Sequence, residues 1–145
     1  MAVQLFGTST VVYLEMKLHN LPLLTLLFLL PVVVNAGPIE KIAELFKKGN
    51  THEIAAYFSA NLDITLMDEA NTYSKAQAEM LLDKFFKEHK PHAVKILHRI
   101  SSNVNYNYAV ISLVTDKGKF RITYTLKEVG KTMEIIEMRI ESEKT

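Results

Sequence analysis

The stretch SKAQAEMLLDKFF, residues 74–86, decides how the rest of this chain can fold. Ser74 and Gln77 have the spacing of a capping box, in which each side chain bonds the backbone of the other residue, so a helix is predicted to begin here. Apolar residues then recur at intervals of three and four, and they give the helix one wide apolar face: Ala78, Leu81, Leu82, Phe85 and Phe86. Lys90-Pro91 is predicted to end the helix, because the residue before a proline disfavours helical geometry. A helix of this kind needs a second layer to cover its apolar face.

The chain after Pro91 supplies that layer as strands. Val94, Ile96, His98 and Ile100 alternate with the residues between them in the period of two that is typical of strands. Further β-forming segments follow at 106–115, 120–126 and 133–140. Asp116-Lys117-Gly118 and Val129-Gly130 are predicted to form tight turns. This succession predicts an antiparallel meander of four strands.

The segment before residue 74 predicts two shorter helices and one strand. Pro38 is suited to the first position of a helix, and Gly49-Asn50 is suited to its end. Thr51 is predicted to cap a second, short helix that carries Ile54, Ala55, Tyr57 and Phe58. Alternation from Leu62 to Leu66 predicts a strand, and residues 68–71 are predicted to turn the chain. Helices followed by strands in this order predict an α+β fold.

The front of the chain has the three parts of a secretory signal peptide. Residues 16–20 form a short basic stretch, residues 21–34 an apolar run, and Val34 and Ala36 are small residues at the spacing that a signal peptidase reads. The run is shorter than the roughly 20 residues that a spanning helix needs, although an uncleaved anchor is the alternative. We expect residues 1–36 to be removed, which leaves residues 37–145 as a single domain without a stable membrane anchor, exported to the periplasm or secreted.

Three further observations concern the residues before and after the predicted cleavage site. Residues 1–15 contain no basic residue, so Met16 is an alternative start and the first fifteen residues a start-site artefact. After removal of Glu15 and Lys17 with the leader, the charge balance stays at +1. This near-neutral balance argues against nucleic acid as a partner. The chain contains no cysteine, which excludes disulfides and zinc–thiolate sites.

Several of these segments resemble an uncharacterised group of exported bacterial proteins, the domain of unknown function 4783. The resemblance rests on YSKAQAE at 73–79, DKFF at 83–86, the later His98 and Phe120-Arg121. More broadly, the order of elements is similar to that of the nuclear transport factor 2-like (NTF2-like) superfamily. That resemblance implies a bent antiparallel sheet that packs around N-terminal helices and one long helix as a cone, with a cystatin-like arrangement as the alternative. The family implies no activity.

His98 is the first candidate for a functional side chain. Its neighbours at i±2 are Ile96 and Ile100, so the alternation places it on their apolar face, which in a cone fold borders the cavity. A histidine there is able to act as a general base or to contact a ligand. The alternative is a buried neutral imidazole with a structural role. Asp63 alternates with Leu62 and Ile64 and is expected to be a solvated carboxylate.

The other pocket candidates are Tyr57, Tyr108, Tyr124 and Arg121. Tyrosines combine an apolar ring with a polar tip and so suit a ligand pocket, although they are also ordinary sheet residues. Arg121 is suited to anion recognition, with a solvated sheet face as the alternative. His89 and His92 flank Pro91, which separates them, so no metal site is predicted. We also expect no cofactor.

These observations favour a non-catalytic exported domain over an enzyme, because no paired acid and base is found in the sequence. Such a domain is expected to bind a small apolar ligand or a protein partner through the cone cavity or the sheet face. The alternative is a small proton-transfer enzyme that uses His98 as its base. A homodimer through the sheet face is compatible with both. Both faces of the sheet have some apolar character, which comes from Leu97, Ile111, Leu113, Met133 and Ile135 and indicates a covered outer face.

Overall fold

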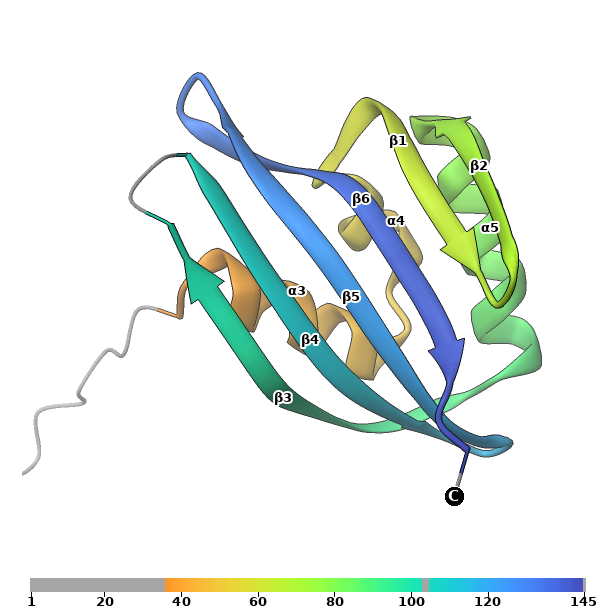
Figure 1. The fold of residues 1–145 in the computed structure, drawn as a ribbon. Coiled ribbons are helices and arrows are strands. Elements are labelled where there is room, and N and C mark those ends of the chain that lie inside the picture. The colour runs from red at the N-terminus through yellow and green to blue at the C-terminus, as the bar shows by residue number, and fades with distance from the viewer. Residues whose placement is uncertain (1–35, 103–104, 145) are drawn as a thin grey trace, which may run out of the picture. The chain divides into compact units, whose positions relative to one another are not determined.

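In the computed structural model, which describes residues 36–102 and 105–144, the strands of these two ranges form one six-stranded sheet in the order β2-β1-β6-β5-β4-β3 (Figure 1). The elements of the described chain follow one another as α3 (Pro38–Lys48), α4 (Thr51–Ala55), β1 (Phe58–Leu66), β2 (Glu69–Ser74), α5 (Lys75–Glu88), β3 (Pro91–Ser101), β4 (Tyr106–Thr115), β5 (Gly118–Val129) and β6 (Thr132–Ser142). The signal peptide predicted for residues 1–36 lies outside the described residues except for Ala36.

The helices begin and end where local chemistry favours it. Pro38 occupies the first turn of α3, and Gly49 ends this helix in the left-handed conformation, with φ of 63°. Ser74 and Gln77 form the predicted capping box at the start of α5. The cap of α4 is Asn50, whose side chain accepts a hydrogen bond from the backbone of Glu53, so the assignment of Thr51 as the cap was wrong.

The sheet has an antiparallel and a parallel part. Strands β3 to β6 form the predicted antiparallel meander. Strand β1 extends this sheet by pairing with β6 in parallel, and β2 then pairs with β1 in an antiparallel hairpin. The sheet is therefore mixed, whereas the sequence predicted an antiparallel one. Residues 69–71 belong to β2 instead of a long turn, and the turn itself is confined to Met67 and Asp68, where Met67 has a φ of 56°.

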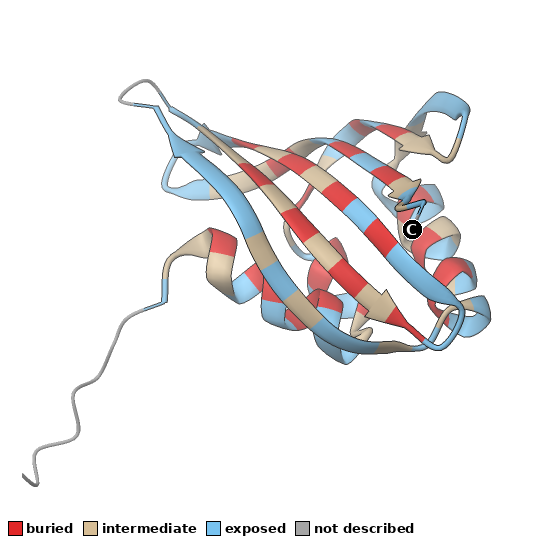
Figure 2. Ribbon diagram, turned by 60° about the horizontal axis from the view of Figure 1, so that its bottom comes forward, coloured by how far each residue is buried: buried red, intermediate tan, exposed pale blue. Residues whose placement is uncertain are grey.

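All three described helices lie on one face of the sheet, which we call the inner face (Figure 1). Buried and partly exposed residues alternate along the strands, as Figure 2 shows for the central ones. Aromatic rings fill the space between α3, α5 and the sheet. The Phe46 ring stacks on Tyr124 with centroids 6.0 Å apart, and Phe85 meets Phe120 edge-on at 5.1 Å. The opposite face, which we call the outer face, carries no described helix.

Candidate functional site

A bulge in β3 determines where His98 lies. Ile96 pairs with the buried Ile111 on β4, but His98 pairs with Val110, so Leu97 is an extra residue at this point of the strand. The extra residue reverses which face the following side chains occupy. Ile100 is 51% exposed, and His98 is exposed too. The prediction that His98 shares the apolar inner face of Ile96 was therefore wrong, because simple alternation does not hold across a bulge.

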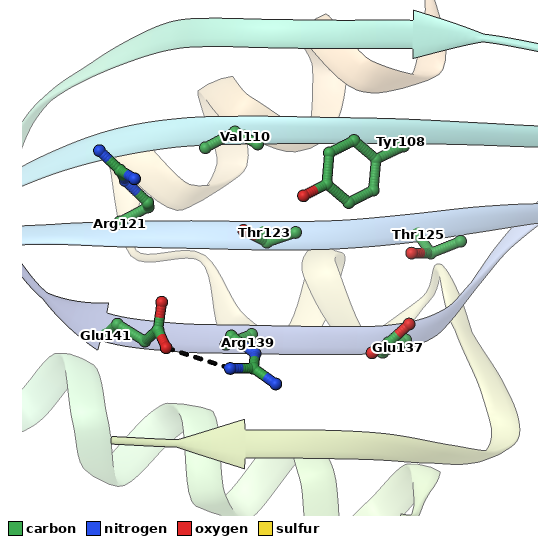
Figure 3. A pocket seen from close by; sticks show the side chains of 8 residues that line it. All are labelled: Tyr108, Val110, Arg121, Thr123, Thr125, Glu137, Arg139 and Glu141. Carbon is green, nitrogen blue, oxygen red and sulfur yellow. Dashed lines mark hydrogen bonds and ion pairs between the residues drawn. The ribbon is translucent and has the colours of Figure 1, made fainter. Parts of the chain in front are cut away.

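A hollow of about 310 Å³ lies on the outer face, over the three neighbouring strands β4, β5 and β6 (Figure 3). We call it the outer-face hollow. Its lining residues alternate with core residues along each strand: Tyr108, Val110, Arg121, Thr123, Thr125, Glu137, Arg139 and Glu141. Two of the predicted pocket residues, Tyr108 and Arg121, are among them.

Register places these side chains in rows across the strands. One row joins Tyr108, Thr125 and Glu137, and the next joins Val110, Thr123 and Arg139. Because directly opposed side chains in a sheet lie close together, each row presents a mixed set of groups to the hollow. In both rows, an aromatic or aliphatic side chain of β4 lies at one end, a threonine of β5 in the middle and a charged side chain of β6 at the other end.

The charges of the hollow occur in both signs. Arg139 donates from Nη1 to Oε1 of Glu141 at 3.2 Å, and Arg121 donates from Nε to Oε1 of Glu143 at 3.4 Å. These side chains remain substantially exposed, at 51% for Arg139, 43% for Glu141 and 54% for Arg121. Exposed pairs of this kind contribute little to stability. Because these side chains are exposed, their guanidinium and carboxylate groups are accessible to a ligand.

Asp63 adds a carboxylate next to the hollow. It is opposite Glu137 in the parallel register of β1 and β6, and its Oδ1 accepts a hydrogen bond of 2.6 Å from the Thr72 hydroxyl. The side chain is exposed, as expected from the sequence.

Tyr124 lies on the inner face, away from the hollow. It is fully buried, and its hydroxyl donates to the backbone carbonyl of Ile39 at 2.9 Å. Burial raises the pKa of the Tyr124 phenol well above its usual range, and the nearby negative charge of Glu40 adds to this shift. Tyr57, at the junction of α4 and β1, packs partly buried against the core. The structure thus separates the five predicted pocket residues. Tyr108 and Arg121 line the hollow, and His98 lies next to it, opposite Val110, whereas Tyr57 and Tyr124 lie elsewhere.

A second hollow, of about 480 Å³, lies between the start of α4 and α5. His52 and Glu79 meet there, with Nδ1 and Oε1 2.9 Å apart. In the part of the chain that the structure describes, no set of three or more histidine or carboxylate side chains is arranged to hold a metal ion. The helices found within residues 36–102 and 105–144 are too short or too polar to cross a membrane.

Sequence reasoning missed most of the outer-face hollow. Thr123, Thr125, Glu137, Arg139 and Glu141 were not identified, although the signal was present in the alternation of polar and apolar residues along residues 120–141. Alternation indicates which side chains share a face. Alternation does not indicate which strands pair with each other, and strand pairing determines which polar residues lie close together.

Helices packed on one face of a bent sheet, with no described helix on the other face, define an α+β fold of the NTF2-like class. An NTF2-like protein of unknown function from Shewanella baltica is 14% identical, with a TM-score of 0.56, and the alignment covers 74% of this chain and 89% of that one. Within this class, the chain belongs to the family described as Domain of unknown function (DUF4783), whose model matches residues 39–141.

Solved structures of DUF4783 proteins agree with this assignment. The protein from Bacteroides ovatus is 21% identical, with a TM-score of 0.69, and the alignment covers 72% of this chain and 94% of that one. The protein from Bacteroides uniformis is 23% identical, with a TM-score of 0.71, covering 75% of this chain and 100% of that one. No curated protein matches the sequence.

Proposed function

We propose that the chain is an exported, non-catalytic binding domain that holds its ligand in the outer-face hollow. The observation that carries this proposal is the contrast between the two faces of the sheet. On the inner face, rings such as Phe46 and Tyr124 pack directly against one another. On the outer face, a hollow of about 310 Å³ is surrounded by accessible charged and hydroxyl groups. Concave sites with a few convergent polar groups are typical ligand sites.

The chemistry of the lining points to a polar ligand. An apolar ligand would remove water from the exposed Arg139 and Glu141 side chains without replacing their hydrogen bonds, which is costly. Within the lining, Val110 is the one aliphatic side chain. We therefore propose a polar occupant in place of the small apolar ligand expected from the sequence.

A binding role is favoured over proton transfer by the position of His98. This histidine belongs to the edge strand β3, whereas the hollow is lined by residues of β4, β5 and β6. A general base must lie within hydrogen-bond reach of the proton that it removes. A substrate bound in the hollow would have to extend across Val110 before it met His98, since these two residues are opposite each other.

Export is supported by two features. The leader pattern of residues 16–36 is one. The other is that a compact unit spans Ala36–Thr145, so cleavage after Ala36 would leave this unit almost whole. Sequencing of the N-terminus of protein recovered from the periplasm or medium tests this part, and Gly37 is the expected first residue. Recovery of a membrane-bound form that retains residues 16–36 would contradict it.

Methyl NMR of the host-processed protein tests the binding site. Val110, Thr123 and Thr125 place methyl groups in the hollow, while Ile111 and Ile122 are buried on the inner face and serve as references. A mixed set of apolar, anionic, cationic and uncharged polar compounds is added in turn. We expect at least one polar class to shift the hollow methyls and to leave the buried references in place.

The outcomes of that measurement separate this site from other arrangements. Shifts confined to the inner-face methyls would place the ligand in the cone and overturn the proposal. A homodimer through the sheet face, which is compatible with the sequence, would cover the same hollow. Sedimentation at the NMR concentration detects it, and a stable dimer whose hollow methyls respond to no compound would also overturn the proposal.

A further inference from the structure

We infer that the occupant of the outer-face hollow is an uncharged sugar, a mono- or disaccharide unit with free hydroxyls. This inference rests on the proposed function, and it names the chemical class of ligand for the same site. Three properties of the hollow support the inference: its balance of charge, its adjacent hydrogen-bond donors and acceptors, and its one aromatic ring.

The balance of charge excludes strongly charged ligands. The lining contains Arg121 and Arg139 as cations and Glu137 and Glu141 as anions, so their formal charges cancel. A phosphate or carboxylate ligand would gain from the arginines but meet the carboxylates, and Asp63 next to Glu137 increases that repulsion. A cationic ligand would meet the arginines in the same way. A neutral ligand with many polar groups avoids both costs.

The donors and acceptors are arranged in adjacent pairs. Arg139 and Glu141 lie side by side, with Nη1 and Oε1 3.2 Å apart, and both remain about half exposed. Arginine presents only donors and an ionised carboxylate only acceptors, whereas a hydroxyl group supplies both functions. Two hydroxyls on neighbouring ring carbons are thus able to accept from the guanidinium and to donate to the carboxylate. The Thr123 and Thr125 hydroxyls extend the same mixed surface between the strands.

Tyr108 supplies the surface that the C–H groups of a sugar ring require. Its ring lies on the same face as Val110 and the two threonines (Figure 3). Aromatic rings carry negative charge on their faces, which attracts the weakly positive hydrogens of C–H groups. The volume of about 310 Å³ is near the lower end for small-molecule sites, which suits a short saccharide.

The test is a methyl NMR titration of the host-processed protein with neutral disaccharides: maltose, cellobiose, lactose and N,N′-diacetylchitobiose. Glucuronate, glucosamine and decanoate are added separately as anionic, cationic and apolar probes. We expect at least one disaccharide to shift the Val110, Thr123 and Thr125 methyls with a dissociation constant below about 10 mM. Because the ligand is uncharged, its affinity should change less than about twofold between low and high salt.

Matched variants locate the binding. Tyr108→Leu removes the ring from the hollow, and Tyr106→Leu removes an exposed tyrosine of the same strand that lies outside the lining. Tyr108→Leu should weaken binding about tenfold, and Tyr106→Leu should leave it unchanged. Arg139→Gln should also weaken binding by about tenfold, because one partner of the ligand hydroxyls is lost. Unchanged denaturation midpoints show that the variants remain folded.

Failure of this inference is distinct from failure of the proposed function. If glucuronate, glucosamine or decanoate shifts the hollow methyls while no neutral disaccharide does, the hollow is a binding site and the sugar assignment is wrong. If no probe shifts them, both proposals are wrong. Equal loss of affinity in Tyr108→Leu and Tyr106→Leu would also overturn the sugar assignment, because binding would then not depend on the hollow.

Discussion

The hydroxyl of Tyr124 on β5 donates a hydrogen bond of 2.9 Å to the backbone carbonyl of Ile39, in the first turn of α3. The bond is fully buried and joins the first described helix to the middle of the sheet. Beside it, Arg99 of β3 pairs with Glu40, and the Phe46 ring stacks on Tyr124. The start of the folded domain is thereby attached to two different strands of the sheet.

Tyr124→Phe removes that hydrogen bond and keeps the ring. We expect the free energy of unfolding at pH 7 to fall by about 0.5–1.5 kcal/mol, the usual net contribution of such a bond. Denaturant titration measures it. Tyr106→Phe is the control, since Tyr106 is 42% exposed. Equal stability of parent and Tyr124→Phe would show that the bond to Ile39 contributes nothing.

The raised pKa of Tyr124 makes the stability difference between the parent and Tyr124→Phe dependent on pH. In the unfolded chain the phenol ionises near pH ~10, but in the folded protein burial and the charge of Glu40 keep it protonated. The unfolded state therefore binds fewer protons above that pH, and stability is lost as the pH rises. The difference in the free energy of unfolding between the parent and Tyr124→Phe should have its full value below pH ~10 and should become smaller above it. A difference that is constant up to pH ~11 would contradict this assignment.

Phe85→Ala should be strongly destabilising. The ring is 3% exposed and contacts Phe120 and His89, with centroids 5.1 and 4.6 Å away. Loss of a buried phenylalanine ring costs about 3–5 kcal/mol. Met80→Ala on the same helix is the matched control, since Met80 is 72% exposed and its change should shift the denaturation midpoint little. Similar midpoints for both variants would mean that the buried face of α5 is assigned wrongly.

Ser74→Ala should remove half of the capping box at the start of α5. The Ser74 hydroxyl accepts from the backbone N–H of Gln77, and this group would lose its partner. A loss of about 1 kcal/mol in unfolding free energy is expected, measured by thermal or denaturant unfolding. Ser74→Asp retains an acceptor and should recover most of the loss; no recovery would argue against capping as the cause.

His98→Gln should leave stability almost unchanged, within about 0.5 kcal/mol of the parent. This expectation follows from the exposed position of His98 after the bulge at Leu97. If the histidine were buried beside Ile96, as the sequence pattern suggested, its replacement would be clearly destabilising. A large drop in the denaturation midpoint would therefore mean that the bulge is not formed in solution.

The comparison of His98 with Ser74 shows what the sequence is able to predict. The capping box, the face of α5 and the meander depend on residues close in sequence, so pattern alone predicts them. The bulge at Leu97 depends on how β3 pairs with β4, which alternation within one strand does not reveal. Strand β2 was missed for a similar reason, because its polar residues, EANTYS, are stabilised as a strand only by pairing with β1.

The candidate site was predicted only in part. Arg121 and Tyr108 were identified from their residue types, but Tyr124 is on the other face of the sheet. Tyr124 and Arg121 are an odd number of positions apart along β5, so the alternation already indicated that they lie on opposite faces. Arg139 and Glu141 join Arg121 only through the pairing of β5 with β6.

The parallel pairing of β1 with β6 has a consequence for the order in which the domain is able to form. Phe58 and Ile64 have Ile135 and Met138 as their register partners, so the first strand pairs with the last strand of the described chain. Contacts between segments so far apart in sequence slow folding, because a long loop must close first. During synthesis, β1 and β2 remain without this neighbour until β6 has emerged. If the chain is exported, as proposed, and crosses the membrane unfolded, this arrangement delays completion of the sheet until β6 is present.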